Sequence, residues 1–240
     1  MLVEVCANSL ESALVAQEAG ADRIELCSEL GVGGITPSYG LIALVKERLD
    51  IPVHVLIRPR SGHFTYTDLE LEVMLKDITF CKQVGVDGIV SGVLQADNGL
   101  DEQKTRVLIE TSRPMKFTFH RAFDWVSNPE KTLQELERLD VDYVLTSGLQ
   151  TSAEKGLDLL RELNQISEKT TVMAGGGVRL DNYEKFKAAG LSAIHFSGSS
   201  FGNEIDLEGK IPMNSASHLR EDQIAVTNFD KVRQIVRSVK

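Results

Sequence analysis

The chain has 240 residues, of which 42% are hydrophobic and 25% are charged, a composition close to the average for a globular protein. Its net charge of −9 disfavours non-specific binding to nucleic acid or anionic membranes, and no apolar run approaches the roughly 20 residues of a membrane-spanning helix. The three cysteines are too few for a disulfide framework, which favours a reducing compartment and makes the cytoplasm the expected location.

Short apolar runs alternate along the chain with segments in which apolar residues recur at the spacing of a helix. This pattern predicts eight strands and eight helices. The first strand starts almost at once, so no signal peptide is visible. Ser9 has the residue type of an N-cap, and Gly20 of a helix end. An irregular stretch at 197–223 precedes the last helix. The predicted strands span 3–6, 21–27, 51–60, 85–90, 115–120, 141–145, 171–174 and 190–196. The predicted helices span 10–19, 37–49, 67–84, 101–111, 129–139, 152–166, 181–189 and 228–239.

The strict alternation of strands and helices favours an α/β fold with a parallel sheet. Eight units in this length predict a single domain over residues 1–240, a closed (β/α)₈ barrel of the TIM type. An open doubly wound sheet is the alternative, but residues 8–10 after the first strand contain no glycine for a dinucleotide-binding turn. Asp22, Asp87 and Asp142 recur at the start of even-numbered strands, which indicates a repeat of two strand–helix units.

The side chains predicted to face the barrel interior are unusually polar, whereas most such interiors are filled by Val, Ile and Leu. A buried carboxylate needs a cation or hydrogen bonds, so Glu4 and Glu25 require partners. These groups form either a structural ion-pair network or a functional site at the mouth formed by the C-terminal strand ends. The inward-facing set is Glu4, Cys6, Arg23, Glu25, Cys27, His54, Leu56, Arg58, Thr118, His120, His195 and Ser197.

Two cysteines end the first two predicted strands, each in the order Glu, aliphatic residue, Cys. We expect Cys6 and Cys27 to lie on neighbouring strands, about 4.8 Å apart at the backbone. Two facing thiolates would bind a soft ion such as Cu(I), and His120 could complete a trigonal site. The alternative is that both cysteines are buried core residues, as we expect for Cys81.

The loops after the seventh and eighth strands carry glycines and serines, and these loops frequently bind phosphate in such barrels. Together with arginines at the mouth, they predict a small phosphorylated or carboxylated ligand. A tight strand-to-helix turn is the alternative explanation for the glycines. The predicted anion-binding residues are Arg60, Arg121, Gly176, Gly177, Ser197 and Ser199.

The second functional hypothesis is an enzyme that acts on an anionic ligand bound in this mouth. Glu25 and His120 would serve as general base and general acid, because burial can bring both residue types toward neutral pKa values. Arg58 and Asp124 fall at the same mouth and complete the predicted catalytic set.

Seven stretches, spread over most of the chain to about His195, carry a resemblance to a known family. They are Glu4-Val5-Cys6, Gly20-Ala21-Asp22-Arg23-Ile24-Glu25-Leu26-Cys27, Gly33-Gly34-Ile35-Thr36-Pro37-Ser38, Ile57-Arg58-Pro59-Arg60, Thr118-Phe119-His120-Arg121-Ala122-Phe123-Asp124, Leu145-Thr146-Ser147-Gly148 and Gly175-Gly176-Gly177.

As an ordered set, these stretches resemble the CutC family, whose name is linked to copper homeostasis, whereas residues 201–217 do not match it. The resemblance implies a TIM-type barrel, a cytoplasmic location and a Cu(I) site at Cys6 and Cys27. The expected partner is therefore a copper ion or a small anionic ligand. Assembly into a homo-oligomer is compatible with either partner. The two hypotheses are a copper-binding protein and an enzyme for a small anionic metabolite.

Overall fold

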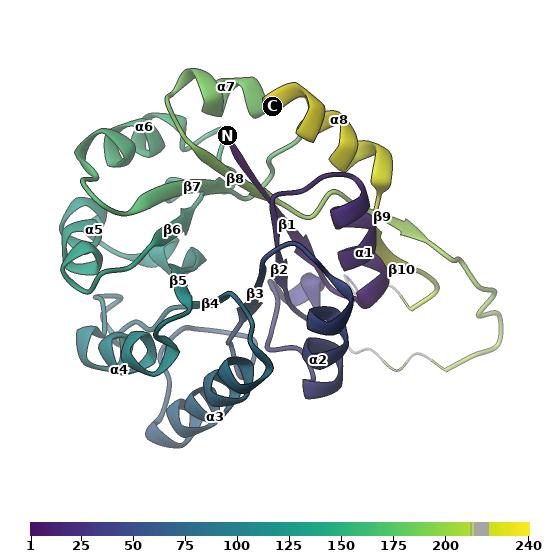
Figure 1. Ribbon diagram of the computed structural model, residues 1–240, viewed down its shortest axis with the longest axis horizontal. Coiled ribbons are helices and arrows are strands. Elements are labelled where there is room, and N and C mark those ends of the chain that lie inside the picture. Colours follow the sequence, from purple (N-terminus) through teal and green to yellow (C-terminus); the bar gives the residue numbers. More distant parts are fainter. Residues whose placement is uncertain (212, 214–220) are drawn as a thin grey trace.

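The computed structural model describes residues 1–211, 213 and 221–240, and its centre is a closed barrel of eight parallel strands. Neighbouring strands follow chain order around the barrel, and the eighth closes it against the first (Figure 1). The predicted (β/α)₈ barrel is confirmed. The strands are β1 (Leu2–Ala7), β2 (Arg23–Leu26), β3 (Val53–Leu56), β4 (Gly88–Ser91), β5 (Lys116–Phe119), β6 (Tyr143–Thr146), β7 (Thr171–Gly175) and β8 (Ala193–Phe196).

The described residues form eight α-helices. These helices surround the barrel (Figure 1). Ser9 caps the first by accepting a hydrogen bond from the backbone N–H of Ser12, and Thr67 and Glu70 form a capping box at the third. No helix in the described ranges is long and apolar enough to cross a membrane. The helices are α1 (Leu10–Glu18), α2 (Tyr39–Arg48), α3 (Asp68–Val84), α4 (Glu102–Ser112), α5 (Pro129–Arg138), α6 (Leu157–Ile166), α7 (Tyr183–Ala188) and α8 (Phe229–Val239).

The stretch predicted to be irregular contains the start of a second, two-stranded sheet beside the barrel (Figure 1). Here β9 (Ser199–Gly202) pairs in antiparallel fashion with β10 (Ile224–Thr227). Neither strand shows an alternating apolar pattern, and their pairing joins segments more than 20 residues apart, so a local sequence signal could not reveal it. Residues 212 and 214–220 of this stretch lie outside the described residues.

The recurring aspartates of the even-numbered strands hold the barrel together at its N-terminal end. In each case the Asp Oδ2 atom accepts a hydrogen bond of 2.8–2.9 Å from a backbone N–H of the preceding odd-numbered strand. Each carboxylate also forms an ion pair with a lysine. The repeat is therefore a structural device at the end opposite the mouth. The backbone bonds run from Val3 to Asp22, from Val53 to Asp87 and from Phe117 to Asp142.

His54 lies inside the barrel, where the neighbouring strand leaves room for its ring only because residue 88 is glycine. A Cβ atom on Gly88 would lie 2.5 Å from the imidazole, and Tyr143 contacts the ring edge-on at 6.2 Å between centroids. Burial, aided by the positive charge of Arg23, lowers the pKa of His54 to about 4. The folded protein therefore holds this histidine neutral at physiological pH.

We expect His54 to destabilise the protein in acid. Unfolded histidine binds a proton below about pH 6.5, whereas the buried ring does so only below about pH 4. The free energy of unfolding should therefore fall by up to about 3 kcal/mol from this group as the pH decreases through that window. Urea titrations between pH 7.5 and 4 should show that the free energy of unfolding depends less steeply on pH in a His54→Gln variant than in the wild type. A parallel curve, displaced by a constant amount, would contradict this expectation.

Candidate functional site

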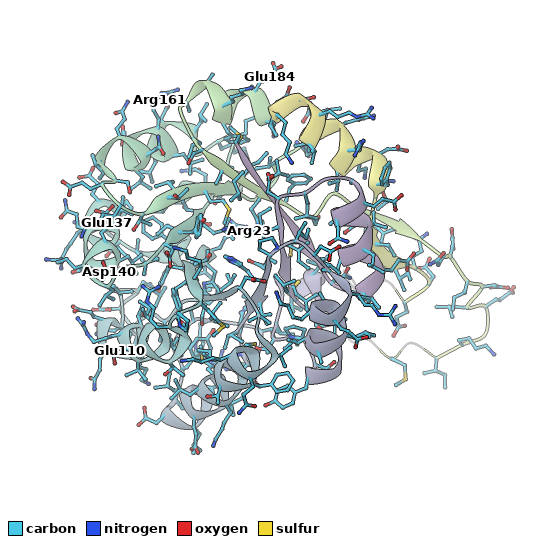
Figure 2. All side chains as sticks on the ribbon, in the orientation of Figure 1. Arg23, Glu110, Glu137, Asp140, Arg161 and Glu184 are labelled. Atoms are coloured by element: carbon cyan, nitrogen blue, oxygen red, sulfur yellow. The ribbon has the colours of Figure 1, made fainter. Side chains whose placement is uncertain are left out.

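A three-residue network crosses the barrel interior below the mouth. Glu4 Oε2 accepts a hydrogen bond from Arg23 Nε at 2.5 Å, and Glu4 Oε1 lies 2.7 Å from His195 Nδ1. The Arg23 guanidinium stacks on the ring of Tyr143, 3.9 Å from its centroid, and lies near the barrel centre (Figure 2). Glu4 is fully buried, so its two oxygens need these cationic and hydrogen-bonding partners.

The network fixes both the charge of Glu4 and the orientation of His195. Burial acts to raise the pKa of Glu4, but Arg23 and His195 outweigh it and hold that pKa at about 2. Burial also opposes protonation of His195, yet the carboxylates of Glu25 and Glu4 raise its pKa. Because Nδ1 of His195 faces Glu4, only Nε2 is left to bind another group.

The two predicted thiols face one another next to this histidine. Cys6 Sγ lies 3.5 Å from Cys27 Sγ and 3.6 Å from Glu25 Oε1. The strand register pairs Cys6 with Glu25, so Cys27 stands two residues further along and just past the end of β2. The neighbouring thiol and burial raise the pKa of Cys6 well above its ordinary value. Both cysteines are thus buried, and Cys6 is protonated at neutral pH.

A glycine turn covers Cys27. Gly34 has a φ of +85°, and a Cβ atom there would lie 2.7 Å from Leu56 Cδ2 and 3.4 Å from Cys27 Cβ. The turn follows the short 3₁₀-helix η1 (Leu30–Val32). Only glycine combines this backbone conformation with such close packing. The two thiols therefore lie in a small apolar cluster with Leu56 and Val90, closed off on the side of Cys27.

Three potential metal ligands come together beside this cluster. One ligand atom each from Cys6, Glu25 and His195 lie within 4.8 Å of one another. With Cys27 at 3.5 Å from Cys6, the donor set comprises two thiols, one imidazole and one carboxylate. The expected third ligand, His120, does not belong to this group; its Nδ1 accepts a hydrogen bond from the backbone N–H of Ala122.

A cavity of about 920 Å³ opens above these groups at the C-terminal mouth. Apolar side chains such as Phe64, Leu145 and Ile235 form much of its wall. Such a wall with a few polar groups is typical of small-molecule sites. Of the residues proposed from the sequence for catalysis or binding, the cavity is lined by Cys6, Glu25, Arg58, His120, Arg121, Gly176, Gly177, Ser197 and Ser199.

Three of the proposed residues are not among those that line the cavity. Cys27 is fully buried beside Cys6, whereas Arg60 and Asp124 have other partners. Arg60 forms an ion pair with Glu70, with Arg60 Nε 2.5 Å from Glu70 Oε1. Asp124 accepts hydrogen bonds from the side chains of Thr146 and Ser147, and an ion pair joins it to Arg121. Both side chains therefore hold loops around the mouth.

Arg58 lines the cavity and also braces the loops beside it. Its two terminal nitrogens donate hydrogen bonds to the carbonyls of Val32, Gly34 and Gly62, while its Nε has no partner among the described residues. The whole Arg58 residue is only 5% exposed.

Sequence reasoning did not assign a site role to His195, Arg179 or Lys231, all of which line the cavity. The alternation of β8 had placed His195 in the interior, and its position beside Glu4 in the barrel register is the signal that could have identified it. Arg179 follows β7, and Lys231 lies in the first turn of α8. No local motif distinguishes these two cations from the other surface charges.

Comparisons with known proteins agree with this architecture. The CutC family model matches residues 1–200. A CutC protein of Erwinia tasmaniensis is 42% identical over 228 residues, which are 95% of this chain and 91% of that protein. A CutC protein of Edwardsiella ictaluri is 47% identical over 82% of this chain and 78% of its own length. The solved structure of a CutC protein from Streptococcus agalactiae, assigned to copper homeostasis, superimposes with a TM-score of 0.79 at 32% identity, covering 82% of this chain and 98% of that one.

We expect Glu4→Gln to destabilise the fold, because it leaves the buried guanidinium of Arg23 without a counter-charge. Removing one partner of a buried ion pair costs about 3 kcal/mol or more. The matched control is Glu102→Gln, which breaks an exposed pair with Arg106 and should cost at most about 0.5 kcal/mol. Urea unfolding at pH 7 measures both, and equal losses would show that the network contributes no more than a surface pair.

Proposed function

This chain belongs to the CutC family, and we propose that it acts in copper homeostasis by binding Cu(I) through the thiolates of Cys6 and Cys27 at the barrel mouth. The observation that carries the proposal is the 3.5 Å separation of the two sulfurs, with His195 and Glu25 next to Cys6. The solved relative that is assigned to copper homeostasis supports the same reading.

The donor set suits a soft metal ion. Thiolate–metal bonds are about 2.3 Å long in zinc proteins, so two sulfurs 3.5 Å apart can contact the same ion. Thiolates favour Cu(I), and imidazole is also a copper ligand. Leu56 and Val90 enclose the sulfurs, which limits access of water and oxidants to the bound ion.

His195 is suited to be a third ligand, because Glu4 holds it in place. A histidine that ligates a metal usually donates its other ring N–H to a carboxylate, which fixes its tautomer and orientation. Nδ1 of His195 faces Glu4 at 2.7 Å in this way, and Nε2 is left for the metal. The bound ion would replace the proton of Cys6, since metal binding requires the thiolate.

The proposal includes a reducing, cytoplasmic setting. All three cysteines are free thiols, including the close pair that an oxidising compartment would tend to join. Cys81 lies in the core on α3, away from the mouth, and takes no part in the proposed site.

We expect the double variant Cys6→Ser and Cys27→Ser to lose the Cu(I) equivalent that the wild type binds, because a hydroxyl is a poor ligand for a soft ion. Cys81→Ser is the matched control: it removes a buried thiol of the helical layer and should keep full binding. Competition with a chromophoric Cu(I) chelator under anaerobic, reducing conditions measures the stoichiometry. Retained binding in the double variant, or a wild type that binds Zn(II) in preference to Cu(I), would refute the proposal.

We expect His195→Asn to weaken Cu(I) binding by at least about tenfold without abolishing it, because two thiolates remain. His120→Asn is the control, since asparagine can still accept the hydrogen bond from Ala122 and His120 lies outside the group of close ligands. The same chelator competition gives both dissociation constants. A larger loss for His120→Asn would assign the third ligand to His120 instead.

A further inference from the structure

We propose that the cavity also binds a small phosphate monoester. Its phosphate would lie against the loops after β7 and β8, and its organic part would reach toward Arg58 and His120. This inference goes beyond the copper site and does not depend on it, because it rests on other groups of the same cavity wall.

Backbone groups at one side of the cavity are free to bind an anion. Gly176, Gly177 and Gly198 line it, and their backbone N–H groups make no hydrogen bond with any residue that the structure describes. All three have positive φ values and carry no side chain that would shield these donors. Gly176 and Gly198 are half-buried, whereas Gly177 is exposed. Half-buried backbone donors are normally paired, so the freedom of the N–H groups of Gly176 and Gly198 points to a ligand with several acceptor oxygens.

Positive charge surrounds the same loops, although the whole chain carries a net charge of −9. Arg121 lies against Gly176: a Cβ there would be 3.2 Å from its Cζ and Nη1 atoms. Arg121 Nη1 makes no hydrogen bond within the described ranges, whereas Nε and Nη2 are held by Asp124 and Ser147. A guanidinium fixed on one edge and free on the other is well placed for a phosphate oxygen.

Two further cations extend this positive region. Lys231 donates a hydrogen bond to the carbonyl of Ser199 at 2.9 Å, which places its ammonium at the loop after β8. Arg179 lines the cavity beside Gly177, and its exposed pair with Asp181 is loose, at 3.5 Å. Two or three cations around free backbone N–H groups match the charge of a phosphate monoester better than that of a single carboxylate.

The opposite part of the cavity wall contains buried donors that lack partners. His120 Nδ1 accepts a hydrogen bond from Ala122 N, so the proton of the neutral ring is on Nε2, which has no partner among the residues that the structure describes. Arg58 Nε likewise has no hydrogen-bond partner in the described part of the chain. Both side chains are 5% exposed, and each unsatisfied buried donor costs about 1–3 kcal/mol. Oxygen atoms of a bound organic group would satisfy these donors.

Phe64 lies against both unpaired donors and would have to adjust when the ligand enters. Its ring centroid is 4.9 Å from that of His120, and the Arg58 guanidinium lies 5.1 Å from the same centroid. Phe64 is only partly buried, and its other neighbour, Trp125, is 50% exposed. A small rotation of this ring would open the donors to the cavity, whose volume of about 920 Å³ suits a small metabolite.

Titration of the metal-free protein with inorganic phosphate tests the anion end. We expect saturable binding with a millimolar dissociation constant, followed by calorimetry or by ³¹P line broadening. Ser199→Asp should weaken it at least tenfold, because it places a carboxylate among the phosphate-binding groups. Ser192→Asp is the matched control: it makes the same change at an exposed position before β8, at the other end of the barrel. No saturable binding, or equal binding by the two variants, would overturn the proposal.

The proposed contacts of the organic part with Arg58 and His120 are tested with three phosphate esters: glycerol 3-phosphate, ribose 5-phosphate and glucose 6-phosphate. At least one should bind tenfold more tightly than inorganic phosphate, and His120→Asn should remove that gain while leaving phosphate binding intact. If no ester binds more tightly than inorganic phosphate, or if the gain in affinity survives in His120→Asn, the proposed contact of the organic part with His120 is refuted. The double variant Cys6→Ser and Cys27→Ser should bind phosphate and ester as the wild type does; loss of both would show that the site depends on the thiols.

Discussion

The structure depends on the burial of one carboxylate, that of Glu4, in the centre of the barrel. Its charge is retained because Arg23 and His195 occupy its two oxygens. An uncompensated charge at this depth would cost several kcal/mol, so loss of any one of these three residues would destabilise the other two. The network also fixes the ring of His195, and one ring nitrogen belongs to the group of close ligand atoms with Cys6 and Glu25. An interaction needed for stability therefore also places a potential metal ligand.

The two ends of the barrel divide the work between stability and binding. At the N-terminal end, the repeated aspartates satisfy backbone N–H groups and pair with lysines. At the mouth, several polar atoms of buried residues have no hydrogen-bond partner within the described ranges, among them Glu25 Oε2 and His120 Nε2. Unsatisfied buried groups reduce stability, so those that belong to the cavity-lining residues Glu25, Arg58 and His120 point to ligand binding. The proposed copper and phosphate sites both draw on this end.

The arginines of the mouth show how one residue type can serve two purposes. Arg60 holds a loop through its ion pair with Glu70, and the terminal nitrogens of Arg58 donate hydrogen bonds to three backbone carbonyls. Arg121 Nη1, beside Gly176, makes no hydrogen bond to any residue that the structure describes. Arg58 and Arg60 lie at the end of the predicted third strand, and Arg121 directly follows the predicted fifth, so the sequence placed all three at the mouth. Only their partners distinguish the arginine that frames the cavity from the arginine that can bind within it.

The sequence by itself determined the barrel and its inward-facing side chains, because these follow from strand periodicity and from the alternation of strands and helices. It also placed the two thiols on neighbouring strands, but the expected direct pairing of Cys6 with Cys27 was wrong, since the register pairs Cys6 with Glu25. It could not determine that His195, rather than His120, joins Cys6, nor that Arg60 and Asp124 would turn to other partners. It also gave no signal for the pairing of β9 with β10. Those features depend on side-chain orientations and on contacts between residues distant in the chain, and only the closed barrel brings such groups within bonding distance.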